Sequence, residues 1–190
     1  MLAERQRKRF TTAEYHQMTA AGILSENDRV ELVEGEILRM AAMGSVHAAC
    51  LGRLTRLFSN VFMDRVIVWV QNPIRIGEYS EPEPDVALLK NRADFYAEGH
   101  PTPEDVYLIV EAADSSIGYD RGFKLPVYAR SGVREVWVVD LDAACVEAYS
   151  QPSKNGYKLI RRGYKGDSLA LASFPDELFY VDDILGRDDL

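Results

Sequence analysis

Cysteine is scarce in this 190-residue chain, which contains only Cys50 and Cys145. Two cysteines this far apart exclude a disulfide framework and a cysteine-based zinc site, and their surroundings favour buried free thiols. Long apolar runs are also missing, since no stretch approaches the roughly 18 residues of a membrane span. The opening MLAERQRKRF carries charges with no apolar stretch behind it, so no signal peptide is expected. These absences together predict a protein of the reducing cytoplasm.

Lysine is scarce too, with six residues against sixteen arginines, and the net charge is −8. An acidic body argues against indiscriminate binding to long DNA, because duplex affinity comes largely from neutralised phosphates. It does not exclude a nuclease, since acids gathered around a metal site are neutralised by the ion. Two basic clusters, at residues 5–9 and 161–165, could contact phosphates through arginine forks, or could be solvated tail and loop charges.

The chain shows no internal repeat, no low-complexity segment and no linker that would divide it. We therefore expect one domain over 1–190, with residues 1–10 as a flexible N-terminal arm. Apolar spacing predicts helices over 12–20, 45–62 and 118–131, and a short helical turn in VDDIL. Strands are expected in RVELVEGEILRM (a hairpin), VIVWVQNPIRI, DVALL, VYLIVE, VREVWVVD, VEAYS, SKNGYKLIRR and DSLALAS. The predicted fold class is mixed α/β, with a central mixed β-sheet flanked by helices and extra β-hairpins.

Charged residues stand at the ends of these predicted strands. Asp85 opens DVALL, Glu111 ends the apolar run VYLIVE, and Asp120 and Lys124 lie in the helix that follows. Each has an ordinary explanation: a solvated carboxylate, a salt bridge from Glu111 to an arginine such as Arg121, and a surface ion pair. Taken together, two carboxylates and an ammonium suit Mg²⁺ held against a phosphate, because Mg²⁺ needs only one or two protein carboxylates beside waters and phosphate oxygens.

The expected topology brings these groups together. Sequential strands usually pair, so Asp85 and Glu111 should lie close enough to share one cation. A spacing of four puts Asp120, Lys124 and Tyr128 on one helical face, unless Pro126 breaks the helix.

The chain resembles the Uma-type putative restriction endonuclease family, a branch of the PD-(D/E)XK nuclease superfamily. The resemblance runs in order through FTTAEYHQM, RVELVEGEILRM, EPDVALL, LIVEAADSS, DRGFK, YARSGVREVWVVD and FPDELFYVDDIL. It implies a restriction endonuclease-like core and an endonuclease that hydrolyses DNA phosphodiester bonds. It also implies Mg²⁺, with Mn²⁺ as a substitute, bound by Asp85 and Glu111. The superfamily's usual lysine lies two residues after the second acid, where this chain has Ala113, and Lys124 from the following helix takes over that role.

Three further residues are candidates for supporting roles. Superfamily members often supply an additional upstream acid, for which Glu34 is the choice here, although turn chemistry alone also explains it. His47 stands where family members also carry a histidine, and it could carry a proton, donate to a phosphate or bond a neighbouring acid. Asp120 is the third. If Glu34, Asp85 and Glu111 converge, repulsion and burial should raise at least one carboxyl pKa.

Other readings stay open. The acidic charge and the missing lysine at Ala113 also fit a catalytically degenerate nucleic-acid-binding or assembly module on the same fold. The ten tyrosines also suggest a sugar-binding or small-molecule-binding β-rich domain, but this function leaves DRGFK unexplained.

Many nucleases that cut both DNA strands are dimers, so a homodimer is expected, with VREVWVVD or the hairpin near Tyr157 at its interface. His16 and His100 offer no constellation and are expected at the surface.

Overall fold

Six strands form the central sheet of the protein, whose computed structural model describes residues 7–113 and 117–186. The strand order is β3-β4-β5-β6-β7-β8, and all neighbours are antiparallel except the parallel pair β5 and β6. The mixed sheet expected from the sequence is therefore confirmed. Its strands are β3 (Val66–Val70), β4 (Val86–Lys90), β5 (Val106–Ala113), β6 (Glu135–Asp140), β7 (Cys145–Ser153) and β8 (Gly156–Tyr164).

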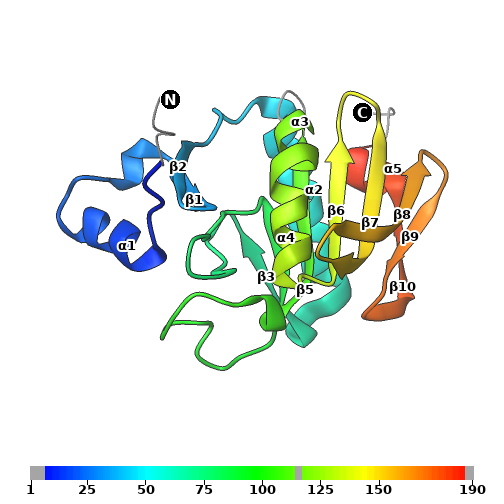
Figure 1. Ribbon diagram of the computed structural model, residues 1–190. Helices are drawn as coiled ribbons and strands as arrows, with labels where there is room; N and C mark the ends of the chain where they lie inside the picture. The colour runs from blue at the N-terminus through cyan, green and yellow to red at the C-terminus, as the bar shows by residue number, and fades with distance from the viewer. Residues whose placement is uncertain (1–6, 114–116, 187–190) are drawn as a thin grey trace, which may run out of the picture.

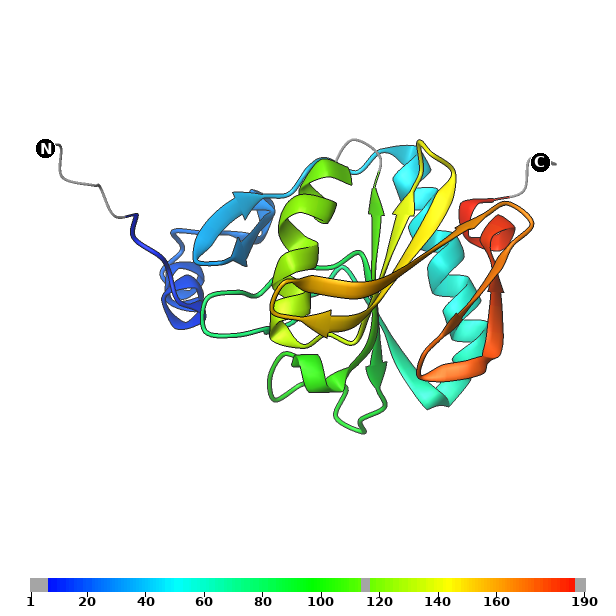
Figure 2. The same cartoon turned by 45° about the vertical axis from the view of Figure 1, so that its right-hand side comes forward.

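Helices cover both faces of this sheet, as Figure 2 shows nearly edge-on. One face packs against α2 (Ser45–Phe62), whose apolar residues at spacings of three and four include the fully buried Leu54 and Phe58, and against α5 (Val181–Leu185). The opposite face packs against a helix made of α3 (Ile117–Tyr119), the π-helical turn η4 (Asp120–Lys124) and α4 (Leu125–Ser131). Because neighbouring residues of a strand point to opposite faces, β5 contributes to both cores.

Pro126 does not break this second helix. The N–H of Leu125 donates to the carbonyl of Asp120, five residues back, so the turn just before the proline is wider than an α-helical turn. A proline has no N–H and crowds the preceding turn, and the widened turn accommodates both effects. The predicted helix over 118–131 is therefore continuous, although not α-helical throughout.

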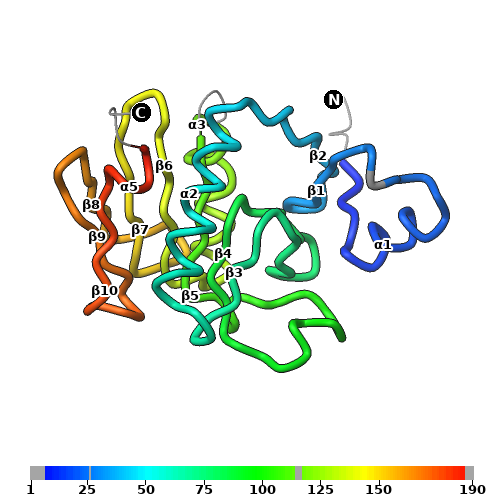
Figure 3. The backbone as a smooth tube through the Cα atoms, turned by 180° about the vertical axis from the view of Figure 1, so that it is seen from behind, coloured from blue at the N-terminus to red at the C-terminus, as the bar shows by residue number. Residues whose placement is uncertain are grey.

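The N-terminal part of the chain forms a separate group beside the sheet (Figures 1 and 3). It holds α1 (Thr12–Ala20), which begins at the capping residue Thr11, and the hairpin of β1 (Val30–Val33) and β2 (Glu36–Arg39). The hairpin turns at Glu34 and Gly35, both at positive φ, as the sequence predicts. Of the arm expected at residues 1–10, residues 1–6 lie outside the described part of the chain. Phe10 is bound to the hairpin through its N–H and the carbonyl of Gly35, 2.9 Å apart.

Two interpretations from the sequence are corrected by the fold. FPDELFY was not recognised as a strand, yet it forms β10 (Phe174–Tyr180), which pairs with β9 (Ser168–Leu171). Phe179 alone among the residues of β10 is buried, so the strand lacks a clear apolar alternation. All of β6, the strand in VREVWVVD, is buried between β5 and β7, so it cannot supply a dimer surface.

The strand expected in VIVWVQNPIRI ends at Val70, whereas the buried thiols are confirmed. Cys50 and Cys145 are buried free thiols. None of the helices described in the structure is long and apolar enough to cross a membrane.

Candidate active site

Asp85 and Glu111 meet at one end of the central sheet. Val86 of β4 pairs with Val110 of β5, so the next step along this antiparallel ladder sets Asp85 opposite Glu111. Residues directly opposed in such a ladder have Cβ atoms about 4.5–5.5 Å apart. The two acids therefore lie side by side, as expected, although 26 residues separate them in the sequence.

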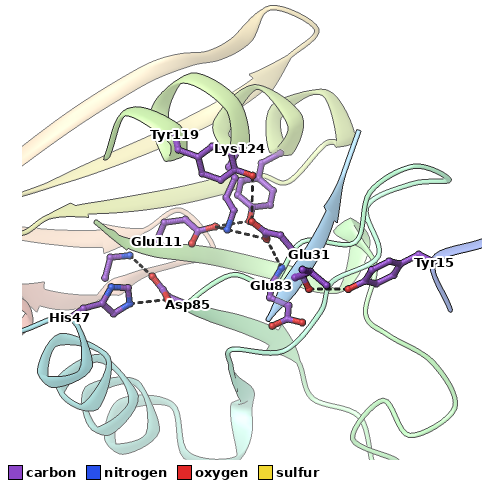
Figure 4. A network of polar contacts seen from close by, with 11 residues as sticks. Tyr15, Glu31, His47, Glu83, Asp85, Glu111, Tyr119 and Lys124 are labelled. Carbon is purple, nitrogen blue, oxygen red and sulfur yellow. Dashed lines mark hydrogen bonds and ion pairs between the residues drawn. The ribbon is translucent and has the colours of Figure 1, made fainter. Parts of the chain in front are cut away.

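Each oxygen of Asp85 has a protein partner. The N–H of Ala112 donates to Oδ2 at 2.9 Å, and Nε2 of His47 lies 2.9 Å from Oδ1 (Figure 4). His47 belongs to the first turn of α2, so the start of that helix is tied to the start of β4. Of the roles considered for His47, the contact with a neighbouring acid is the one present in the structure.

Lys124 and Tyr128 reach Glu111 from the opposite helix. The Lys124 amine lies 3.3 Å from Glu111 Oε1, and the Tyr128 hydroxyl donates to the same oxygen at 2.6 Å. Asp120, Lys124 and Tyr128 are all buried, in agreement with their spacing of four residues. Arg121 points elsewhere, because it pairs with Asp140 and Glu147 at 2.7 and 2.8 Å. The salt bridge considered between Arg121 and Glu111 is therefore absent.

Glu31 is a member of the site that sequence reasoning missed. Its Oε2 lies 3.2 Å from the Lys124 amine and accepts the N–H of Glu83 at 3.1 Å. The Tyr119 hydroxyl donates to its Oε1 at 3.4 Å (Figure 4). Lys124 thus bridges Glu31 from β1 and Glu111 from β5. The available signal was a carboxylate inside the apolar strand VELV, where a buried charge needs a partner.

Glu34, the upstream acid chosen from the sequence, lies outside this group. Its backbone adopts a φ of 51° in the hairpin turn, and its carboxylate pairs with Arg130 on the surface at 2.7 Å. Strand residues three apart face opposite sides, so Glu34 cannot follow Glu31 toward Lys124. The turn chemistry recognised in the sequence accounts for Glu34.

A cavity of about 330 Å³ opens over these side chains. It is lined by the site carboxylates, by Lys124 and His47, and by two exposed arginines of the β1–β2 region, Arg29 and Arg39. Residues of both signs thus surround one opening at the end of the sheet. The acidic lining residues are Glu31, Glu83, Asp85, Glu111 and Asp120.

The Uma2 family model, described as "Putative restriction endonuclease", matches residues 12–181. The chain belongs to this family. The match includes α1, all ten strands and every residue of the cavity.

The fold of this Uma2 member is similar to that of a solved protein from Anabaena variabilis, titled a "putative nuclease belonging to DUF820". The superposition has a TM-score of 0.71 at 14% sequence identity, and it covers 93% of this chain and 97% of the other. At that identity the likeness shows a shared fold. No curated protein matches the sequence.

Ala113 occupies the position at which the resemblance stated from the sequence would place a lysine. Its side chain is fully buried in the core beneath α4, together with Leu125 and Val127. A lysine at this position would lose its hydration inside an apolar cluster, which is costly without a partner. The amine nearest to Glu111 is instead that of Lys124.

Burial dominates the electrostatics of this site. It raises the pKa of Glu111 to about 8, with further upward contributions from Asp120 and Asp85, while Lys124 and the Tyr128 hydroxyl oppose the shift. Burial alone would lower the pKa of Lys124, but Glu111, Glu31 and Asp120 outweigh it and raise that pKa. The sequence predicted a raised carboxyl pKa from the convergence of Glu34, Asp85 and Glu111. Glu34 does not converge with the others, and the raised pKa of Glu111 comes mainly from burial.

Replacing Glu111 with glutamine should stabilise the metal-free protein at pH 8. The pKa of Glu111 is about 8 in the folded state against an ordinary 4.5. Between these values the folded state retains a proton that the unfolded state has lost, so stability falls as pH rises from about 4.5 to about 8. The loss should be on the order of a few kcal/mol. Urea unfolding in EDTA at pH 5.5 and pH 8 measures it.

The matched control is Glu34→Gln, because that carboxylate is part of a surface ion pair. Glu34→Gln should leave the pH dependence of the unfolding free energy unchanged, whereas Glu111→Gln should flatten it. Equal pH dependence in wild type and Glu111→Gln would contradict the assignment of the raised pKa.

The expectation that His16 and His100 form no constellation is wrong. Both imidazoles approach the buried carboxylate of Glu81, with Nε2 of His16 2.6 Å and Nε2 of His100 3.9 Å from its Oε1. Residues 16, 81 and 100 lie in three separate segments, so no local spacing could reveal this group.

Proposed function

We propose that this protein is a Mg²⁺-dependent endonuclease that hydrolyses phosphodiester bonds of DNA. One observation carries the proposal: Asp85, Glu111 and Lys124, from two strands and the following helix, line one cavity in a chain of the Uma2 family. Asp85 and Glu111 are the proposed metal ligands, and Lys124 is the proposed catalytic cation, moved from position 113 to the helix.

The donor set suits a hard cation. Close to Asp85 and Glu111 the cavity offers carboxylate oxygens, which Mg²⁺ prefers. Mg²⁺ needs only one or two protein carboxylates beside waters and phosphates, so Asp85 and Glu111 would suffice. The raised pKa of Glu111 also supports the proposal, since strongly shifted pKa values in a cavity are typical of functional sites. When bound, Mg²⁺ would neutralise phosphate charge and lower the pKa of a coordinated water.

The chain's own residues supply orientation and charge. His47 and the N–H of Ala112 fix the two oxygens of Asp85, and Tyr128 fixes Glu111. Lys124 lies in the cavity wall, where its amine can stabilise charge developing on a phosphate. Arg29 and Arg39 are placed to contact neighbouring phosphates through their planar forks.

The direct test is cleavage of supercoiled plasmid and short duplexes by the pure protein in Mg²⁺ or Mn²⁺. Cleavage should stop in EDTA and in Asp85→Ala. If no condition gives cutting that Asp85→Ala abolishes, the enzyme proposal fails. A degenerate binding module would bind DNA without cutting, and calorimetry would show no Mn²⁺ binding that depends on Asp85 and Glu111.

Bound metal should also stabilise the fold. Millimolar Mg²⁺ or Mn²⁺ should raise the melting temperature, because a ligand that binds only the folded state shifts the unfolding equilibrium. The rise should be larger at pH 8 than at pH 6, since protons compete for a carboxyl whose pKa is about 8. Differential scanning fluorimetry against EDTA measures it. A melting temperature indifferent to both ions at both pH values would count against the metal site.

We also propose a homodimer, because each copy carries one site and cutting both strands requires two. With β6 buried, the surface that remains is the outer strand β8, which exposes the side chains of Leu159, Ile160 and Tyr164 near Tyr157. Sedimentation of wild type and Ile160→Glu at micromolar concentration tests this surface, and a wild-type monomer would refute it.

A further inference from the structure

Two histidines and a buried glutamate form a compact group outside the carboxylate site. His16 comes from α1, Glu81 from the segment before β4, and His100 from the loop between β4 and β5. Among the described residues this is the one set of three or more His, Cys, Asp or Glu residues whose candidate ligand atoms all lie within 4.8 Å of one another. None of these three residues has been assigned a role in nucleic-acid cleavage.

The three ligand atoms are close enough to converge on one transition-metal ion after a small movement of the side chains. Zn²⁺ binds imidazole nitrogen and carboxylate oxygen at about 2.0–2.2 Å, so tetrahedral ligand atoms sit roughly 3.3 Å from each other. Here the two histidine nitrogens lie 2.6 and 3.9 Å from Glu81 Oε1, on either side of that value. Imidazole nitrogen favours Zn²⁺ over Mg²⁺, which prefers oxygen ligands.

Glu81 is held in place by groups that leave Oε1 to the histidines. Its side chain is only 2% exposed, its N–H donates to the carbonyl of Leu32 at 2.7 Å, and Arg75 Nε donates to Oε2 at 3.1 Å. Such partners orient a ligating carboxylate and are typical of metal sites. A cavity of about 900 Å³ borders all three residues and leaves room for a fourth ligand such as water.

The helix that carries His16 has little else to hold it. No residue of α1 is buried, so apolar packing contributes little to its position. Polar contacts attach it to the rest of the protein, among them Thr12 N–H to the Glu78 carbonyl at 2.8 Å and the Tyr15 hydroxyl to the Val30 carbonyl at 2.9 Å. A metal bridge from His16 to Glu81 and His100 would close long loops between three segments and fasten this helix.

We propose that His16, Glu81 and His100 bind one Zn²⁺ ion with an open fourth position, and that this ion fastens α1 to the body of the protein. The cavity beside this site shares Arg29, Gln71 and Glu83 with the cavity over Asp85. The two cavities are therefore neighbours, although no residue of α1 lines the cavity over Asp85.

Isothermal titration of the full, EDTA-treated chain with Zn²⁺ in excess Mg²⁺ tests the proposal. One equivalent should bind, and His16→Ala and His100→Ala should each weaken binding at least tenfold. Bound Co²⁺ should give the intense visible absorption of tetrahedral coordination in wild type and lose it in both variants. Free Zn²⁺ at about 100 times Kd should raise the melting temperature by about 5–10 °C.

The controls separate this site from the carboxylate site. Asp85→Asn and His47→Gln should bind Zn²⁺ as wild type does, because neither residue touches the group. His16 is 43% exposed in its side chain, so His16→Ala should still fold. Its melting temperature in EDTA should be lower, because the buried Glu81 loses a partner, and the rise that Zn²⁺ produces in wild type should be absent. Hydrogen exchange in α1 should slow on Zn²⁺ addition in wild type and not in His16→Ala.

Three results would overturn the proposal. One is the absence of Zn²⁺ binding, which would leave His16 and Glu81 as a hydrogen-bonded pair. Another is Zn²⁺ binding that persists unchanged in both histidine variants, and the third is binding that is lost in Asp85→Asn. None of these results depends on whether the protein cleaves DNA.

Discussion

Replacing Asp85 with asparagine should lower the rate of DNA cleavage by at least about 100- to 1,000-fold, the loss typical of removing one charge-stabilising group from a protected site. The substitution removes the negative charge but keeps the size of the side chain and an oxygen that can accept the Ala112 N–H. The fold should therefore survive. Single-turnover cleavage of a labelled duplex in Mg²⁺, with circular dichroism as the folding check, measures the effect.

Two further variants should reduce cleavage less than Asp85→Asn does. His47→Gln should lose about 10- to 100-fold in metal affinity or rate, because His47 orients Asp85 and is not itself proposed as a ligand. Glu34→Gln should cut at nearly the wild-type rate, since Glu34 lies in a surface turn paired with Arg130. If Glu34→Gln lowered the cleavage rate as much as Asp85→Asn does, the assignment of Glu31 to the site in place of Glu34 would be wrong.

Replacing Lys124 with methionine should cost about 3–5 kcal/mol of stability in the metal-free protein at pH 8, besides abolishing cleavage. Removing one partner of a buried ion pair leaves an uncompensated charge, which accounts for a loss of this size. Lys124 has a side chain only 7% exposed and lies 3.2 and 3.3 Å from Glu31 and Glu111. Without the amine these two carboxylates repel each other in a poorly hydrated place. Urea unfolding in EDTA measures the change.

The pH and a second substitution isolate the electrostatic part. The loss should shrink at pH 5.5, where protonation of Glu111 replaces the missing cation. The double variant Lys124→Met/Glu111→Gln should recover most of the stability at pH 8 and still fail to cleave DNA. A loss that is equal in the Glu111→Gln background would instead assign the stabilisation to the pair with Glu31 or to packing.

Several residues of the site could be predicted from the sequence because their positions depend on local patterns. The spacing of apolar residues predicted α2 and the helix that carries Lys124, and the ends of DVALL and VYLIVE marked Asp85 and Glu111. Strands adjacent in sequence usually pair, so the approach of these two acids followed from their positions. The four-residue spacing likewise placed Lys124 and Tyr128 on one face.

Tertiary structure decided the remainder. Whether Glu31 or Glu34 faces Lys124 depends on the hairpin turn and on how β1 meets the sheet, and all the alternating glutamates of VELVEGE look alike in sequence. The continuous helix through Pro126 required one widened turn, which no residue pattern announces.

The sequence by itself determined most of the strands and helices, and it marked Asp85, Glu111 and Lys124, because periodicity and strand ends are properties of short segments. It did not reveal β10 or the role of Glu31. Only the fold decided that His47 bonds Asp85, that Lys124 bridges Glu31 and Glu111, and that His16 and His100 meet at Glu81. These contacts join residues up to 93 positions apart, as for Lys124 and Glu31. Their formation depends on how separate elements pack together, and this packing produces no periodic pattern in the sequence of any single element.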